Sequence, residues 1–166
     1  MVHTSPMVRT AIFVSNIEKS INFYNKVLGV KDVYAEGSLT HSAGAKLLGV
    51  EADSPIRYHI LRSQNINKGM IGLFEVKEEN PHTIKRDATK YNVGEACMVF
   101  YCDKLNKVVE ELSNINHEAL CPPVFLEVDI ETGFLSSAKR GQREMTFRDP
   151  DGILINLIER DPTRED

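Results

Sequence analysis

The chain has 166 residues, a formal net charge of −4 and a hydrophobic content of 42%. This composition is typical of a soluble globular protein, and no apolar run is long enough to span a membrane. Basic residues are dispersed along the chain, which argues against a nucleic-acid-binding surface. The first residues, MVHTSPMV, lack the basic start and apolar core of a secretory signal, so we expect a cytoplasmic protein.

The cysteines and histidines show no pattern of a disulfide framework or a structural zinc site. Cys97, Cys102 and Cys121 are odd in number and lack a Cys-x-x-Cys spacing. The histidines are scattered without ligand spacing, at His3, His41, His59, His82 and His117. We therefore expect neither a metal nor another cofactor.

The first half of the chain predicts the element order βαβββ. Residues 8–14 alternate like a strand, with Arg9 on the opposite face from the apolar residues. Ser15 and Glu18 have the spacing of a capping box, and the amphipathic helix that follows stops at Gly29. Further strands are predicted at residues 31–39, 56–62 and 70–76, and residues 40–55 are predicted to form a loop.

The second half repeats this pattern. A strand at residues 96–102 leads to Asp103, which is placed to cap a helix whose apolar stripe is Leu105, Val108 or Val109, Leu112 and Ile115. When the two helix starts are aligned, Arg9 falls opposite Cys97, an offset of 88 residues. A loop at Pro122-Pro123, a strand at residues 124–130 and a loop ending near Gly141 are expected next.

A hairpin over residues 144–159 closes the second half. Asp149-Pro150-Asp151-Gly152 is typical of a turn, because Pro150 fixes φ and Gly152 tolerates positive φ. The strand at residues 153–158 is apolar on both faces except at Asn156. Asn156 is therefore either a hydrogen-bonded structural amide or part of a binding pocket.

The predicted fold class is α+β, with two tandem βαβββ modules in one domain. The first module covers residues 7–78, a polar connection covers residues 79–93, and the second module covers residues 94–160. The charged residues 160–166 are expected to be frayed.

Three stretches carry a resemblance to a known family: VSNIEKSINFYNKVLGV, GEACMVFYCDKLNKVVEEL and TFRDPDGILINLIE. The sequence resembles the vicinal oxygen chelate superfamily, which includes glyoxalase I, extradiol dioxygenases, methylmalonyl-CoA epimerase and bleomycin-resistance proteins. The resemblance implies that each module is a curved sheet around a cavity, often completed by dimerisation. A homodimer is therefore expected.

In the metal-using members of this family, four ligands come from equivalent strands of the two modules. The resemblance places Arg9, Gly72, Cys97 and Asn156 at those positions. An arginine cannot deprotonate and repels a divalent cation, and one thiol and one amide do not replace four ligands. We therefore expect that the metal site of the family has been lost.

The favoured function is metal-free binding of a small polar or anionic organic molecule, with or without its chemical conversion. Arg9 would supply positive charge, Asn156 a donor and an acceptor, and Met70 adaptable packing. Stacking surface would come from Phe13, Phe74 and Tyr101. The alternatives are a surface salt bridge for Arg9 and plain core packing for the others. Cys97 is either a nucleophile or proton carrier whose pKa is lowered by a cation such as Arg9, or an inert buried thiol.

Two other functions stay open. A metal-dependent lyase, isomerase or dioxygenase of the family type could use His41, His59, Glu75 or Glu159 instead. A sequestering resistance protein would need a dimeric groove and no chemistry. The acidic composition would suit a cationic ligand of such a protein, whereas Arg9 argues against one.

Overall fold

The protein is described here from a computed structural model, over residues 2–39, 42–51, 54–78, 81–127 and 141–159. The chain divides into two compact units, Met1–Ile84 and Lys85–Asp166. No helix among the described residues is long and apolar enough to cross a membrane. Each unit has its own mixed four-stranded sheet, and neither sheet closes into a barrel.

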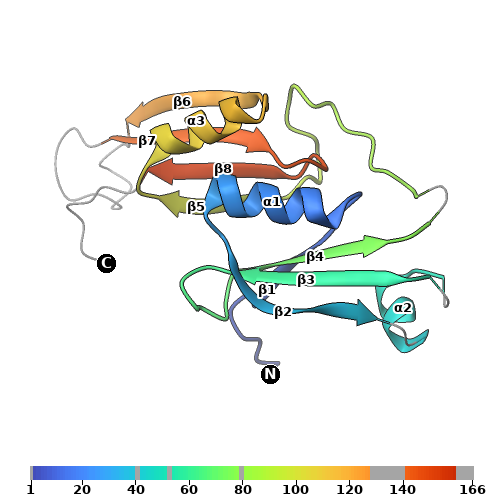
Figure 1. Cartoon of the computed structure of the whole chain (residues 1–166). Coiled ribbons are helices and arrows are strands. Elements are labelled where there is room, and N and C mark those ends of the chain that lie inside the picture. The colour runs from blue at the N-terminus through green and yellow to red at the C-terminus, as the bar shows by residue number, and fades with distance from the viewer. Residues whose placement is uncertain (1, 40–41, 52–53, 79–80, 128–140, 160–166) are drawn as a thin grey trace. The chain divides into compact units, whose positions relative to one another are not determined.

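The first unit contains a sheet with the strand order β1-β4-β3-β2, called sheet A (Figure 1). β1 is parallel to β4, and the other neighbours are antiparallel. The predicted strands are confirmed here, with small shifts at their ends. The elements are β1 (Arg9–Phe13), α1 (Ile17–Leu28), β2 (Asp32–Leu39), α2 (Ser42–Leu48), β3 (Ile56–Arg62) and β4 (Met70–Val76).

Helix α1 begins one residue later than the capping-box spacing suggested. Asn16 is the N-cap, and its side chain accepts a hydrogen bond of 2.9 Å from the backbone N of Lys19. The predicted Ser15 cap is therefore wrong. Asparagine is as good an N-cap residue as serine, and here Asn16 has the extended conformation of an N-cap. The predicted stop at Gly29 is confirmed, with φ of 66° in the left-handed region.

One face of sheet A packs against α1. Ile12 and Leu73 from the sheet meet a helix face that includes Ile17 and Tyr24, and all four are buried. The alternation predicted for the first strand is confirmed, since Arg9 lies on the opposite, exposed side. We call the side away from α1 the open face of sheet A.

Helix α2 was not predicted, and it covers one end of this open face. Residues 40–55 were expected to be a loop because of Gly44 and Gly49, but the Ala-Lys-Leu-Leu run between them favours a helix. Ala45 of α2 packs against Ile56 and Phe74 in one buried cluster. The hydrophobic effect therefore holds α2 on the sheet.

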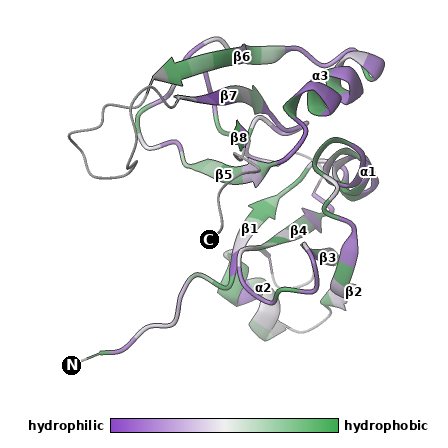
Figure 2. Cartoon of the chain, turned by 90° about the vertical axis from the view of Figure 1, so that its left-hand side faces the viewer, coloured by the Kyte–Doolittle hydropathy of each residue, from purple (hydrophilic) through white to green (hydrophobic). Residues whose placement is uncertain are grey.

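The second unit repeats the arrangement as sheet B, with the order β5-β8-β7-β6. The prediction of two βαβββ modules is thus confirmed. The elements are β5 (Cys97–Cys102), α3 (Leu105–Asn114), β6 (Ala119–Glu127), β7 (Gly141–Arg148) and β8 (Leu154–Glu159). Helix α3 covers one face of sheet B, and in Figure 2 it carries both hydrophobic and hydrophilic residues along its length.

Three predictions about this unit need correction. The N-cap of α3 is Lys104 rather than Asp103, and it makes no side-chain capping bond. Leu105, Val108 and Leu112 form the buried stripe, whereas Val109 and Ile115 are exposed. Pro122-Pro123 lies within β6 and not in a loop, because an edge strand with register shifts on both sides of Cys121 tolerates prolines.

The closing hairpin is confirmed in its strands and its turn. The Gly152 N donates to the Asp149 O at 3.0 Å, and Gly152 has φ of 87°. The buried Asp149 side chain accepts hydrogen bonds from the backbone N of Asp151 and of Ile153. The predicted strand end at residues 128–130, the loop before Gly141 and the tail 160–166 lie outside the described residues.

Candidate functional site

Four of the predicted site residues lie on the open face of sheet A. Arg9 and Phe13 of β1 pair with Met70 and Phe74 of β4, residue by residue, in a parallel ladder. The side chains of Met70 and Phe74 are buried. Arg9 is exposed, and Phe13 is about half exposed. The sequence therefore identified one continuous patch on this sheet.

Arg9 lies beside a glycine on the neighbouring strand. A Cβ atom built on Gly72 would lie 3.5 Å from the Cδ of Arg9, so the side chain of Arg9 passes over a position without a side chain. Within the described part of the chain, no carboxylate forms an ion pair with Arg9. By contrast, Arg57, Arg86, Arg143 and Arg148 all have acidic partners.

Aromatic rings continue this patch across the sheet. The ring centroids of Phe13 and Phe74 are 6.1 Å apart, and those of Tyr58 and Phe74 are 6.4 Å apart. The sequence analysis missed Tyr58. Its place became evident only from the pairing of Tyr58 with Phe74 across β3 and β4. Of these rings, Phe13 is exposed on the same face as Arg9, whereas Phe74 is buried and Tyr58 packs against the cluster under α2.

The other three predicted site residues lie on sheet B, on the side away from α3. Cys97 and Tyr101 belong to β5, and Asn156 of β8 pairs with Val99 between them. Cys97, Val99 and Tyr101 are all exposed. These residues are equivalent in the repeat to the patch on sheet A.

Asn156 is held by hydrogen bonds within its own sheet. Its Nδ2 donates to the Glu144 Oε2 at 3.1 Å and to the Thr146 Oγ1 at 3.3 Å. It also lies 3.4 Å from the backbone O of Met145. The amide is therefore oriented by residues of β7, as expected for a hydrogen-bonded structural amide. Its side chain nevertheless lies on the face of sheet B that was predicted to carry the site.

Cys97 does not have the electrostatics of a nucleophile. Desolvation raises the pKa of its thiol, and the Glu95 carboxylate acts in the same direction. A backbone hydrogen bond from Asn156 and the charge of Arg148 lower the pKa, but their effect is smaller. The hypothesis of a cation-lowered pKa at Cys97 is thus wrong, and the group is a protonated thiol at neutral pH.

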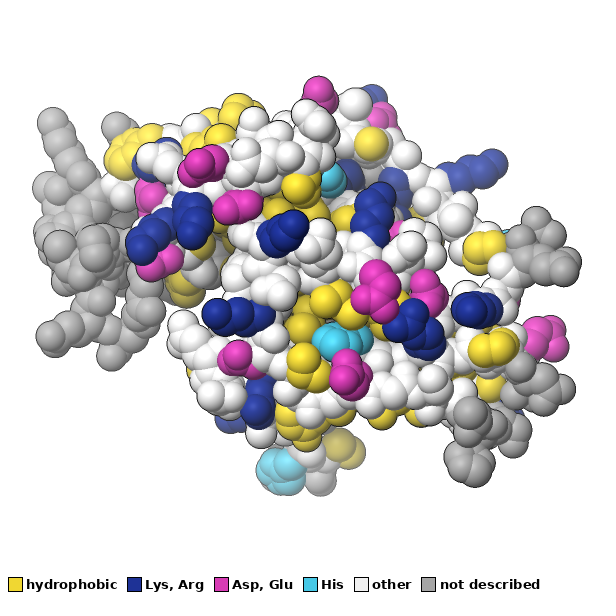
Figure 3. Space-filling view, viewed as in Figure 1, with side chains coloured by type: hydrophobic (Ala, Val, Ile, Leu, Met, Phe, Trp, Pro, Cys, Tyr) yellow, Lys and Arg dark blue, Asp and Glu magenta, His cyan; other side chains and the backbone are white. Residues whose placement is uncertain are grey.

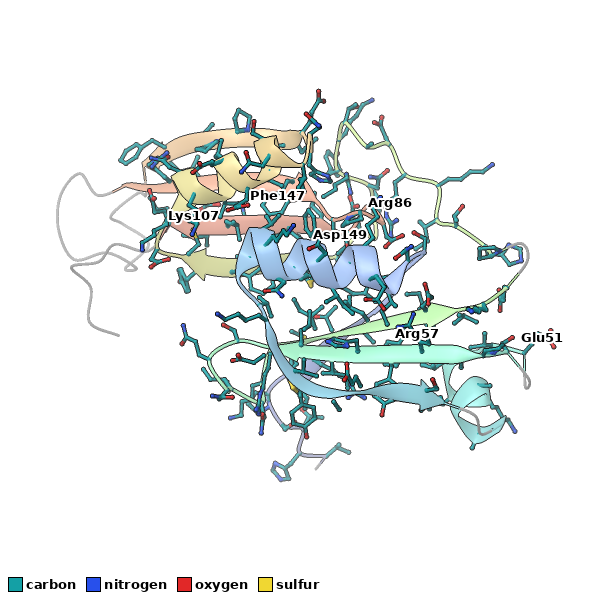
Figure 4. The ribbon with its side chains drawn as sticks, in the orientation of Figure 1. Glu51, Arg57, Arg86, Lys107, Phe147 and Asp149 are labelled. Atoms are coloured by element: carbon teal, nitrogen blue, oxygen red, sulfur yellow. The ribbon has the colours of Figure 1, made fainter. Side chains whose placement is uncertain are left out.

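Glu75 and Glu159, the alternative metal ligands, anchor helices instead. The Glu75 Oε1 accepts from the backbone N of Ile17, the first residue of α1, at 3.1 Å, and Arg57 Nη1 lies 3.4 Å from its Oε2 (Figure 4). In the second unit, Glu159 accepts from the backbone N of Leu105 at 3.3 Å and from Arg143 at 3.0 Å. Both carboxylates therefore point to the helix side of their sheets.

The remaining residues do not fit the metal centre that the resemblance implied. Arg9 and Gly72 occupy the positions on sheet A, and Cys97 and Asn156 those on sheet B. The Nδ1 of His59 lies 2.9 Å from the Oε2 of Glu36, on the side of sheet A that faces α1. His41 lies outside the described residues. Among the residues that the structure describes, no three His, Cys, Asp or Glu side chains cluster.

A buried ion pair that the sequence analysis missed holds the second unit together. Arg148 donates to both carboxylate oxygens of Glu95, and also to the backbone O of Gly152 at 2.8 Å and of Lys90 at 2.8 Å. The hydrogen bond to Arg148 lowers the pKa of Glu95 to about 2. The Nε of Arg86 also lies 3.5 Å from the Oε1 of Glu95. Arg86 is next to the hairpin turn that begins at Asp149 (Figure 4).

Comparison with solved structures supports the fold. A glyoxalase family protein from Bacillus cereus superposes with a TM-score of 0.69 at 17% identity, and the match covers 95% of each chain. The trypanothione-dependent glyoxalase I of Leishmania major gives 0.58 at 16%, covering 94% of this chain and 87% of that one. A domain from Frankia sp. EAN1pec gives 0.57 at 14%, with 96% and 100% covered. At these identities the likeness concerns the fold alone.

Sequence comparison identifies the family to which the chain belongs. A search of curated proteins found no match. The model of the Glyoxalase/Bleomycin resistance protein/Dioxygenase superfamily matches residues 6–157, which include both strand-helix units and the closing hairpin. Since this match covers nearly the whole chain, the protein belongs to the Glyoxalase/Bleomycin resistance protein/Dioxygenase superfamily.

Proposed function

We propose that this chain binds a small organic anion on the open face of sheet A, without the divalent metal of its family. The ligand class is a planar molecule that carries a carboxylate or an enolate. The exposed ring of Phe13, which packs against Phe74, supplies a surface for the planar part, and Arg9 supplies the charge.

The observation that carries this proposal is the state of Arg9. Its guanidinium has no ion-pair partner in the described part of the chain, and its side chain passes over Gly72, which carries no side chain. A guanidinium can bind a carboxylate through two parallel hydrogen bonds. The guanidinium of Arg9 is therefore available to bind an anionic ligand and is not part of a structural ion pair among the described residues.

The protonated state of Cys97 limits the reactions that this protein could catalyse. A protonated thiol is a poor nucleophile, which favours binding or proton transfer over covalent catalysis. We propose further that the protein acts in the cytoplasm as a homodimer. Neither nucleic acid nor a membrane is a proposed partner, and basic and acidic groups are interspersed on the face in Figure 3.

The test begins with a thermal-shift screen of small aromatic and aliphatic carboxylic acids against the wild-type protein. The best acid is then titrated by calorimetry into the wild type, Arg9→Ala and Arg9→Lys. We expect Arg9→Ala to weaken binding by about 10- to 100-fold, as for a charge-assisted hydrogen bond. Arg9→Lys should restore only part of the affinity, because an ammonium lacks the planar fork.

Arg57→Ala is the matched control. It removes an arginine from the other face of the same sheet, where Arg57 pairs with Glu18 and Glu75. We expect it to lower stability slightly and to leave the affinity for the acid unchanged. Equal affinity of the wild type and a folded Arg9→Ala variant would refute the proposal.

A further inference from the structure

A groove of about 360 Å³ lies in the second unit, between the C-terminal half of α3 and the bulged strand β6. Its apolar lining comes from Val109 and Leu112 of α3, Met145 of β7 and the Pro122-Pro123 pair. Glu118, between α3 and β6, is the acidic residue of the lining. The groove lies on the helix side of sheet B, away from the residues of the proposed function.

Helix α1 of the first unit carries two aromatic residues at the positions equivalent to this part of α3. With the offset of 88 residues, Phe23 and Tyr24 of α1 align with Glu111 and Leu112 of α3. Phe23 and Tyr24 are buried and pack edge to face, with ring centroids 5.7 Å apart. In the second unit a carboxylate and a smaller aliphatic group replace these two rings. Helix α3 therefore has less side-chain volume than α1 at these two positions, one of which, Leu112, lines the groove.

The strand opposite the helix widens the same space. The pairing of β6 with β7 shifts between Ala119 and Cys121 and again between Cys121 and Val124. Pro122 and Pro123 lack backbone N–H groups, so they cannot continue the ladder. The shifts make the strand irregular where the groove is lined by the two prolines.

The electrostatics at the mouth of the groove favour a cation. The C-terminal end of a helix carries partial negative charge, and α3 has no basic residue in its last turn, whereas α1 has Lys26 there. Glu118 adds a full negative charge beside the same end. The Nε2 of His117, also in the lining, is already engaged with the Arg148 carbonyl O at 2.6 Å.

We propose that this groove is a second binding site, which takes a small arylalkylammonium ion. The aromatic ring of the ligand packs on Val109, Leu112 and Met145, and its ammonium group lies beside Glu118. An aromatic carboxylate of equal size is disfavoured by the same charges.

The test uses protein labelled with [¹³C-methyl]methionine, titrated with 2-phenylethylamine and, separately, with 3-phenylpropionate. Met145 lines the groove, while Met70 and Met98 lie on other parts of the sheets and report non-specific effects. We expect the amine to shift the Met145 methyl resonance in a saturable manner. The carboxylate should leave that resonance in place.

Variants separate the contributions of shape and charge. Val109→Trp places a large ring over the groove from an exposed position and should abolish the shift of Met145. Glu118→Gln should weaken binding of the amine by about three- to fivefold, as for an exposed ion pair. Glu110→Gln removes the same charge from an exposed residue of α3 outside the lining and should change nothing.

Three results would overturn the proposal. The first is equal binding of the amine and the carboxylate, which would make the groove apolar without a preference for cations. The second is an unchanged titration in a folded Val109→Trp variant. The third is a Met145 resonance that moves with protein concentration alone, which would assign the groove to a second copy of the chain.

Discussion

Arg148 shows how one residue connects the turn of the second unit to the segment before its first strand. A guanidinium has five N–H donors, and those of Arg148 reach Glu95, Gly152, Lys90 and Ala88. The side chain is buried, so each of these contacts replaces a lost contact with water. Glu95 neutralises the charge and is thus essential to this arrangement.

Replacing Glu95 by glutamine should destabilise the protein by about 3–5 kcal/mol, because a buried arginine loses its counter-charge. The pKa of Glu95 is about 2 in the folded protein, below its ordinary value of 4.5. The pair therefore stabilises fully above pH 4.5, and its contribution is lost as the pH falls toward 2. Urea unfolding of the wild type and Glu95→Gln at several pH values measures both effects.

The difference in stability between the two proteins should shrink as the pH falls through this window. Asp103→Asn, a change at an exposed carboxylate of the same unit, serves as the control and should show no such trend. A constant difference from neutral pH to the acid limit would contradict the assigned role of Glu95.

Cys97 should react slowly with iodoacetamide at neutral pH although it is exposed. Its pKa is raised by desolvation, so the thiolate is scarce until the solution is alkaline. Peptide mapping of the alkylated protein across a pH series gives the rate at this residue, and Cys97→Ser identifies its peptide. Rapid modification at neutral pH would restore Cys97 as a candidate nucleophile.

At the scale of elements, each unit fixes its long helix by the same device. A glutamate at the end of the central strand accepts a hydrogen bond from the first helical N–H and also binds an arginine of a neighbouring strand. A carboxylate at this position satisfies a free backbone donor and interacts favourably with the helix dipole. In α3, where the N-cap side chain makes no such bond, Glu159 takes over that role.

Glu159→Gln should therefore lower the free energy of unfolding by about 0.5–2 kcal/mol, the range for loss of a helix cap. Glu75→Gln should cost less, because Asn16 still caps α1. Hydrogen exchange of the first turn of α3 should increase in Glu159→Gln. Glu110→Gln, on the exposed side of α3, is the control, and equal effects of Glu75→Gln and Glu159→Gln would argue against this difference between the helices.

Element by element, periodicity predicted the strands of sheet A and the two long helices well, because each has one buried and one exposed face. Helix α2 was missed, since its stability comes from the contact of Ala45 with Ile56 and Phe74, which are distant in sequence. The start of β6 was missed because prolines usually end strands, and the register shifts that accommodate them leave no signal in the sequence.

The candidate site was predictable only where the repeat fixed the register. Aligning the helix starts placed Arg9 and Cys97 correctly on the faces away from the helices. Tyr58 and the Arg148–Glu95 pair were not predictable, because their neighbours depend on strand pairing and on the path of the polar connection. The thiol of Cys97 is exposed and not buried, because it lies on the face of β5 away from α3.

For the whole molecule, we predict a homodimer. Each sheet leaves apolar side chains exposed on the side away from its helix, including Phe13, Val99 and Tyr101. Exposed apolar surface of this kind is often covered by association. Sedimentation equilibrium at micromolar concentration should give twice the chain mass, and Tyr101→Lys should shift the equilibrium toward the monomer. A single species of 18.7 kDa for the wild type would count against the dimer.

We propose that Arg9, and not a divalent metal, supplies the positive charge that binds the ligand. This role of Arg9 is tested most directly by titrating the acid found in the thermal-shift screen into the wild-type protein, once after exhaustive treatment with a chelator and once with added Zn²⁺, Fe²⁺, Mn²⁺ or Ni²⁺. We predict the same affinity in every case, since an arginine keeps its charge without metal. Binding that disappears with the chelator and returns with one equivalent of a metal ion would contradict the claim.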